Sequence, residues 1–189
     1  THTLIQGYVT YTYICTEYPF FDLAPRMKMC VLQMANHKAF SATHGYDYFP
    51  VTEPLEHLKG TNLSDVRWHK SFVVQDLLLR YDWVFWSDCD AMFMNFSLPL
   101  PIPRATPSSG SAVPHMIIIG DNYQAINSGQ FLIDNSQWSL NILSQIPSAR
   151  VPWNRDRKHN CGNAGKDNPV FNWYVPLALS LSLSLSLSL

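Results

Sequence analysis

The sequence predicts an α/β fold with a mostly parallel central sheet flanked by helices. Short runs rich in β-branched and aromatic residues alternate along the chain with longer segments whose apolar residues recur at helical spacing. One short run, residues 82–87 (DWVFWS), is almost entirely apolar without polar alternation, which is typical of a strand buried on both faces by helices. At 189 residues, the chain is long enough for one domain with a sizeable core.

The first half of the chain predicts two further strands and two helices. Residues 8–16 (YVTYTYICT) form a strand, and residues 26–45 form a helix that ends at Gly45, because glycine readily adopts the left-handed conformation of a C-cap. Residues 46–49 (YDYF) form the next strand. Ser64 is the N-cap of a second helix, which ends shortly before the apolar strand.

The second half begins with a loop and ends with a helix. Residues 98–114 are rich in proline and serine and predict a loop. Two further strands are expected in residues 115–120 (HMIIIG) and 130–133 (QFLI). Ser136 is the predicted N-cap of a helix over residues 137–146.

Composition limits the classes of function. The net charge of −1 and the lack of a Lys/Arg run give no electrostatic reason to expect nucleic acid or an anionic membrane as a partner. The four cysteines contain no C-x-x-C pair, which argues against a structural zinc site. No apolar run reaches the roughly 18 residues needed to span a bilayer, so a membrane anchor is expected only outside this chain. Glycosylation sequons at Asn62 and Asn95 are compatible with a secretory compartment.

Residues 180–189 differ from the rest of the chain. They continue a strict alternation of leucine and serine that has no cap, turn or partner strand. The sequence therefore predicts one folded domain over residues 1–179, followed by a low-complexity tail.

Two carboxylates follow the apolar strand at one-residue spacing, Asp88 and Asp90. In an extended chain both side chains lie on one face, while Cys89 points away. Ligands of open α/β sheets bind just beyond the carboxyl ends of the strands. Paired carboxylates favour a hard divalent ion, Mn²⁺ or Mg²⁺, which usually keeps substrate phosphates among its ligands. The alternative is a pair of exposed carboxylates at a strand-to-loop junction.

Four ordered blocks resemble the glycosyltransferase family that includes plant galactomannan galactosyltransferases, xyloglucan xylosyltransferases and fungal Golgi α-1,6-mannosyltransferase subunits. They are NHKAFSATHGYDY (residues 36–48), RWHK (67–70), DWVFWSDCDAMFMN (82–95) and AINSGQFLIDNSQWSLNIL (125–143). Together they extend over more than half of the chain.

The resemblance implies a GT-A fold, a UDP- or GDP-sugar donor, Mn²⁺ on the D-x-D motif and transfer with retention of anomeric configuration. It makes Asp88 and Asp90 the metal ligands and Lys70 a cationic partner for the donor phosphate or sugar. The alternative for Lys70 is a solvated helix lysine. A further group is implied beside the donor sugar: Asn127, Ser128 and Gly129.

The remaining site residues rest on weaker similarity. Thr16, at the end of the first predicted strand, is a nucleotide contact by its position in the fold. Asp167 stands where the family often has Asp-Gln near the donor sugar, although Asn168 departs from that pattern, and it is the candidate catalytic residue. The family's late histidine segment, which supplies a third metal ligand, is replaced here by the Leu/Ser repeat, which leaves His115 and His159 as candidates.

The resemblance also implies partners and a location. The acceptor is a polysaccharide or glycoprotein glycan, the compartment is the Golgi lumen, and related subunits can form hetero-oligomers. One alternative is a non-catalytic, donor-binding subunit of a glycosyltransferase complex. A second is an Asp-nucleophile phosphatase, because an apolar strand ending in D-x-D also begins haloacid-dehalogenase-like phosphatases. Those enzymes usually carry Thr or Val where this chain has Met92.

Overall fold

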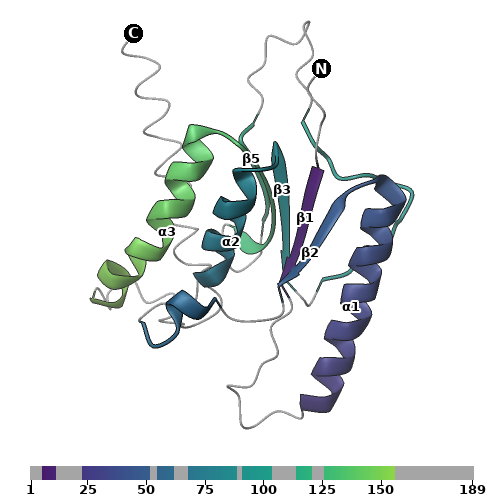
Figure 1. Ribbon diagram of the computed structural model, residues 1–189, viewed down its shortest axis with the longest axis horizontal. Helices are drawn as coiled ribbons and strands as arrows, with labels where there is room; N and C mark the ends of the chain where they lie inside the picture. The colour runs from purple at the N-terminus through teal and green to yellow at the C-terminus, as the bar shows by residue number, and fades with distance from the viewer. Residues whose placement is uncertain are drawn as a thin grey trace, which may run out of the picture.

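The computed structural model describes residues 6–11, 23–51, 55–61, 68–88, 91–103, 114–120 and 126–155 (Figure 1). The elements in chain order are β1 (Gln6–Tyr11), α1 (Leu23–His44), β2 (Asp47–Val51), the short 3-10 helix η1 (Glu56–Leu58), α2 (His69–Leu78), β3 (Trp83–Asp88), β4 (Met116–Ile119), β5 (Asn127–Asp134) and α3 (Gln137–Arg155). In this part of the chain, no helix combines the length and apolar character needed to cross a bilayer.

The five described strands form one sheet in the order β2-β1-β3-β5-β4. β1 is parallel to both β2 and β3, whereas β5 is antiparallel to β3 and to β4. The α/β class is confirmed, but the sheet is mixed rather than mostly parallel. Only residues 120–126 separate β4 from β5, and a parallel connection needs a dozen or more residues, so these two strands must run in opposite directions.

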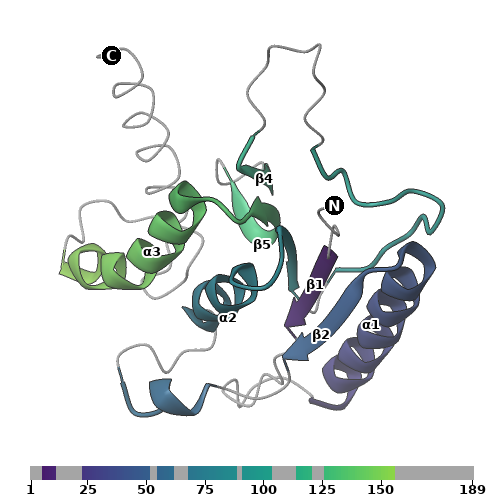
Figure 2. The same ribbon diagram turned by 45° about the horizontal axis from the view of Figure 1, so that its top comes forward.

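Helices cover the sheet on both faces, as Figures 1 and 2 show. α2 and α3 lie side by side on one face, and α1 lies on the other, next to β2 and β1. The larger apolar cluster fills the space between the sheet and the α2–α3 pair. Its fully buried side chains include Trp68 and Trp86, Phe131 and Ile133, and Ile146. Each side chain of this size contributes about 1.5–3 kcal/mol on burial, so this layer is the main apolar contribution to stability.

A second apolar cluster lies on the opposite face of the sheet. Phe40 of α1 and Tyr46 are buried there, and Phe85 of β3 packs against them together with Phe93 and Phe96. Residues 91–103, which follow β3 and contain neither helix nor strand, therefore act together with α1 as the cover of this face. The prediction that the β3 strand is covered on both faces is confirmed, with an extended segment supplying part of one cover.

Most predicted elements are present with shifted ends. α1 ends at His44, and Gly45 has a φ of +70°, so the predicted glycine C-cap is confirmed. Ser136 caps α3, because the backbone N–H of Ser139 donates to Ser136 Oγ over 3.2 Å. α3 continues to Arg155, beyond the predicted end. Ser64, residues 12–16 and the tail at residues 180–189 lie outside the described residues, so their predictions stay untested.

Candidate functional site

The predicted site lies at the edge of the sheet where β1, β2 and β3 end. Tyr11 and Asp88, the last residues of β1 and β3, are neighbours in the register. β5 runs in the opposite direction, so its first residues lie at this same edge, and Ser87 pairs with Gln130. The antiparallel strand thereby brings the Asn127-Ser128-Gly129 block to Asp88, which a strand parallel to β3 would have placed at the far end of the sheet.

Asp88 is held in place from two sides. Its side chain is 38% exposed. Trp86 Nε1 donates to Asp88 Oδ1 over 2.6 Å, a contact that the two-residue period of β3 allows because both side chains lie on one face. Lys70 Nζ lies 3.2 Å from Oδ1 and 3.4 Å from Oδ2 of the same carboxylate. The carboxylate is therefore oriented and partly neutralised before any ligand arrives.

Lys70 is buried in the first turn of α2 with only 3% of its side chain exposed. Its ammonium also donates to the backbone O of Ser128 over 3.2 Å and to Ser128 Oγ over 3.4 Å, and it lies 5.7 Å from the centre of the Trp86 ring. A buried ammonium group needs such partners because the loss of hydration is costly. The alternative of a solvated helix lysine is wrong, since Lys70 joins α2, β3 and β5 from inside the fold.

Gly129 sits where a side chain has no room. A Cβ at this position would lie 2.9 Å from Asn127 Oδ1 and 3.4 Å from Asp88 Oδ2. The backbone N–H of Gly129 donates to the same Asn127 Oδ1 over 2.8 Å, which closes a tight turn at the start of β5. Ser128, between them, is fully buried. The glycine therefore keeps the space beside the Asp88 carboxylate open.

A hard divalent ion prefers oxygen ligands, and the partly exposed carboxylate of Asp88 can supply one at this edge. Within residues 6–155, apart from the stretches left undescribed, no group of three or more His, Cys, Asp or Glu side chains converges on a common point. Asp90, Asp167 and Thr16 lie outside the described residues, as does His159, so their predicted roles stay predictions.

His115 does not lie at this edge. Its Nδ1 is 2.8 Å from Asp134 Oδ2, and its ring stacks on Trp138. Asp134 pairs with Trp83, the first residue of β3, whereas Asp88 is the last. At about 3.3 Å per residue, the length of β3 separates the two ends by roughly 16 Å. The suggestion that His115 supplies a metal ligand beside Asp88 is therefore wrong.

Helix α1 fixes the backbone that follows the D-x-D motif. Asn36 Nδ2 donates to Phe93 O over 3.0 Å, and Phe93 N donates to Asn36 Oδ1 over 2.8 Å. His37 Nε2 donates to Ala91 O over 2.8 Å, and His44 Nε2 donates to Phe96 O over 3.0 Å. The rings of Phe40 and Phe93 stack with centroids 3.6 Å apart. We call these contacts the α1 clamp.

The clamp includes two residues that the sequence analysis did not assign, Asn36 and His37. His37 is fully buried, and this burial holds its pKa below the usual value of 6.5, while the hydrogen bond to Ala91 opposes that shift. The sequence signal for this region was the NHKAFSATHGYDY block as a whole, which did not distinguish Asn36 or His37 from its other residues. His44 is a structural contact, as its hydrogen bond to Phe96 shows.

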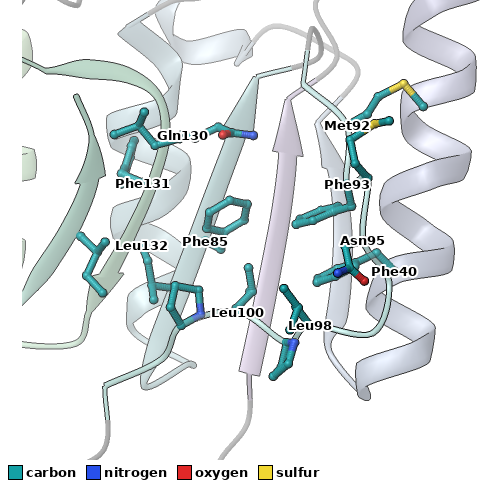
Figure 3. A pocket seen from close by; sticks show the side chains of 15 residues that line it. Phe40, Phe85, Met92, Phe93, Asn95, Leu98, Leu100, Gln130, Phe131 and Leu132 are labelled. Carbon is teal, nitrogen blue, oxygen red and sulfur yellow. The ribbon is translucent and has the colours of Figure 1, made fainter. Parts of the chain in front are cut away.

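An apolar groove of about 460 Å³ opens on the face covered by α1 and residues 91–103 (Figure 3). Phe85 and Leu132 form its floor on the sheet, and Phe93 and Leu98 contribute from the segment that crosses above them. Gln130 is the polar side chain that β5 contributes to the lining, and its Nε2 donates to Ser87 Oγ over 3.3 Å. The groove lies on the face opposite the larger apolar core.

The fold is similar to that of a solved glycosyltransferase. A crystal structure of a glycosyltransferase involved in the glycosylation of the major capsid of PBCV-1 superimposes with a TM-score of 0.56 and 16% sequence identity, over 90% of this chain and 75% of that one. At this identity the likeness establishes the fold alone.

The family follows from the sequence match. Residues 24–164 match the galactosyl transferase GMA12/MNN10 family, and this chain belongs to that family. The match contains the α1 clamp as well as the Asp88 edge. The predicted resemblance is thereby confirmed, and the phosphatase alternative loses its support.

Curated relatives agree with this assignment. Glycosyltransferase 6 of Arabidopsis thaliana is 32% identical over 113 residues, which are 57% of this chain and 25% of the relative. Xyloglucan 6-xylosyltransferase 4 of Arabidopsis thaliana is 31% identical over 81 residues, 40% of this chain and 16% of the relative. A probable glycosyltransferase 3 of Oryza sativa subsp. indica is 33% identical over 81 residues, 40% of this chain and 18% of the relative. The matched part thus spans a quarter or less of each relative.

Proposed function

We propose that this chain is the donor-binding part of a retaining glycosyltransferase that moves a hexose or pentose from a UDP- or GDP-sugar to a polysaccharide or glycoprotein glycan. The supporting observation is the convergence of Asp88, Lys70, Ser128 and Gly129 at the carboxyl edge of the sheet, inside the family-matched segment. Open α/β sheets bind ligands at this edge. The whole protein acts in the Golgi lumen under this proposal, as the family resemblance implies.

The proposed metal ligands are Asp88 and Asp90, with Mn²⁺ or Mg²⁺ as the ion. When bound, such an ion supplies positive charge that stabilises the leaving nucleoside diphosphate. Asp88 is already paired with the Lys70 ammonium, which lowers its attraction for a second cation. Asp90 is therefore the proposed main anionic ligand, and Asp88 is a supporting one that also accepts hydrogen bonds from donor hydroxyl groups.

The other residues of the chain bind and orient the donor under this proposal. Gly129 lets the donor sugar approach the β5 backbone closely, because no Cβ fills the space beside Asp88. Lys70 holds Asp88 and Ser128 in register, and its ammonium is the proposed cationic partner of the donor phosphate or sugar. Asn127 fixes the turn at the start of β5, Asp167 is the proposed catalytic carboxylate beside the donor sugar, and Thr16 is a proposed nucleotide contact.

The test is calorimetric titration of the chain with UDP-sugars and GDP-sugars, in Mn²⁺ and then in excess chelator. Binding that needs the metal and is lost in Asp90→Ala and Asp88→Ala is the expected result. Asp76→Asn is the control, because Asp76 is an exposed carboxylate on α2 that pairs only weakly with Arg80 at 3.4 Å. Equal affinity in chelator contradicts metal-dependent donor binding.

Sugar transfer and donor hydrolysis measured in the same samples separate two roles. Binding with turnover supports a catalytic domain. Binding without turnover supports the non-catalytic, donor-binding subunit that the sequence also allowed. Phosphate release from simple phosphomonoesters without nucleotide binding would contradict both.

A further inference from the structure

The sequon Asn95-Phe96-Ser97 lies on residues 91–103 and takes no part in the proposed donor site. We propose that Asn95 is an N-glycosylation site, with an oligosaccharide attached to Nδ2. This proposal rests on the lumenal location proposed above, because the modifying enzyme acts in the secretory pathway.

The side chain of Asn95 is exposed and belongs to the lining of the apolar groove. Asn95 and Ser97 are both exposed. Ser97 N donates to Asn95 Oδ1 over 3.0 Å, and Ser97 Oγ donates to the same oxygen over 2.7 Å. Within the part of the chain that the structure describes, Nδ2 of Asn95 has no hydrogen-bond partner. The amide oxygen is thus used by the local turn, and the nitrogen is left for modification.

The chemistry needs nothing beyond the usual lipid-linked donor. Nδ2 of Asn95 forms a bond to the anomeric carbon of the oligosaccharide and loses one proton, while the bond from that carbon to the lipid diphosphate breaks. The hydroxyl two positions later, Ser97 Oγ, completes the acceptor motif and already contacts the Asn95 amide.

A glycan at this position is compatible with the folded structure. Phe93 and Phe96 turn inward and pack on the second apolar cluster, and His44 holds Phe96 O, so the backbone on both sides of Asn95 is fixed without its side chain. Figure 3 shows Asn95 among the side chains that line the groove, on the same segment as Phe93. Attachment through Nδ2 leaves both hydrogen bonds of Oδ1 intact.

Exposed apolar side chains lie close to Asn95 in the chain, and a glycan there would cover them. Met94 is 89% exposed and Leu98 is 62% exposed, and both belong to the same segment. Exposed apolar side chains that gather on one surface favour association. A glycan on Asn95 lies within reach of both and would keep other chains from the groove margin.

The experiment expresses the chain behind a cleavable signal peptide in a eukaryotic host and examines the total cell and medium fractions by endoglycosidase shift and intact mass. Four variants accompany the wild type: Asn95→Gln, Ser97→Ala, Ser97→Thr and Asn62→Gln. Total fractions are used because glycans are attached before folding is completed. A poorly secreted variant therefore still shows whether Asn95 carries a glycan.

We expect one glycan to be lost in Asn95→Gln and in Ser97→Ala, and to be retained in Ser97→Thr, which preserves the acceptor motif. Asn62→Gln should leave that glycan in place. Wild-type mass equal to the unmodified chain, or a glycan that disappears only in Asn62→Gln, overturns the proposal. Donor binding by unglycosylated protein from bacteria is measured separately, so failure here and failure of the proposed function are distinguishable.

Discussion

Asn36 and Phe93 lie 57 positions apart in the chain and are joined by two reciprocal hydrogen bonds, of 3.0 Å from Asn36 Nδ2 to Phe93 O and of 2.8 Å from Phe93 N to Asn36 Oδ1. One side chain thus makes two hydrogen bonds to the Phe93 backbone, much as a neighbouring strand would. Since Phe93 follows the D-x-D motif by three residues, the α1 clamp fixes the backbone just beyond that motif.

Replacing Asn36 tests this relationship. Asn36→Ala removes a donor and an acceptor from a partly buried backbone pair, and each such bond contributes about 0.5–1.5 kcal/mol. We expect a loss of about 1–3 kcal/mol in the free energy of unfolding, measured by urea denaturation, and faster hydrogen exchange at the Phe93 amide. Lys38→Ala on the exposed side of α1 is the control. Similar losses in the two variants would show that the bonds to Phe93 contribute nothing specific.

His37 should make stability depend on pH. Its pKa in the folded chain is lower than the unfolded value of 6.5, because burial disfavours the imidazolium. Between these values the unfolded chain binds more protons, so stability rises with pH. The contribution of neutral His37 to the free energy of unfolding is complete above about pH 6.5. It is lost as the pH falls, by at most about 1.4 kcal/mol per pH unit.

His37→Gln isolates this contribution from that of the other histidines. The Gln Nε2 retains a donor for Ala91 O but does not titrate. Urea denaturation from pH 5 to pH 8 should show a smaller increase in stability for the variant than for the wild type. Curves of stability against pH that run parallel for the two proteins would contradict the assignment of this pH dependence to His37.

Lys70→Met tests the buried ion pair. It leaves Asp88 without its cation and Ser128 O without its donor. Hydrogen bonds to charged groups contribute about 1.5–3 kcal/mol, and Asp88 can regain some hydration because it is 38% exposed, so we expect a loss of about 1–3 kcal/mol in stability.

Two comparison variants show whether the loss of stability in Lys70→Met comes from the buried ion pair. Arg80→Met breaks the exposed pair with Asp76 and should cost less than about 1 kcal/mol. The double variant Lys70→Met with Asp88→Asn should be less destabilised than the sum of the single variants, since removing both charges leaves none uncompensated. Additive losses in thermal or urea unfolding would mean that the two side chains do not interact.

The strands and helices could be predicted because local patterns specify them. The apolar run that became β3, Gly45 after α1 and Ser136 before α3 are each short-range signals of burial or capping. Strand direction is not such a signal. It follows from connections, and the prediction of a mostly parallel sheet did not take into account the short link that makes β4 and β5 antiparallel.

The site was predictable in part because the family resemblance marks several of its residues. Asp88, Lys70 and Gly129 stand in recognisable blocks, and the structure brings them together through β3, α2 and β5. The partners of Asn36 and His37 lie more than 50 positions away, on a backbone with no regular structure. No local periodicity encodes a hydrogen bond from a side chain to a distant backbone, so the α1 clamp required the structure.

Gly129→Ala is the most direct test of the proposed donor site. The added Cβ would lie 2.9 Å from Asn127 Oδ1, closer than real Cβ contacts, and 3.4 Å from Asp88 Oδ2, so Asn127 has to shift. Gly129 shows no positive φ, so backbone conformation adds no strain, and we expect a stability loss of only about 1 kcal/mol. The methyl group nevertheless occupies the space beside Asp88 in which the donor sugar is proposed to bind.

We therefore expect metal-dependent affinity for a nucleotide sugar to fall at least about tenfold, which corresponds to about 1.4 kcal/mol, while affinity for the free nucleoside diphosphate falls less. Asn127→Ala is the matched variant, because it releases the turn without filling the space. If the steric argument holds, calorimetry will show a larger loss of sugar-donor affinity in Gly129→Ala than in Asn127→Ala. Equal affinity of the wild type and Gly129→Ala for the intact donor would place the sugar away from β5 and refute the proposed site.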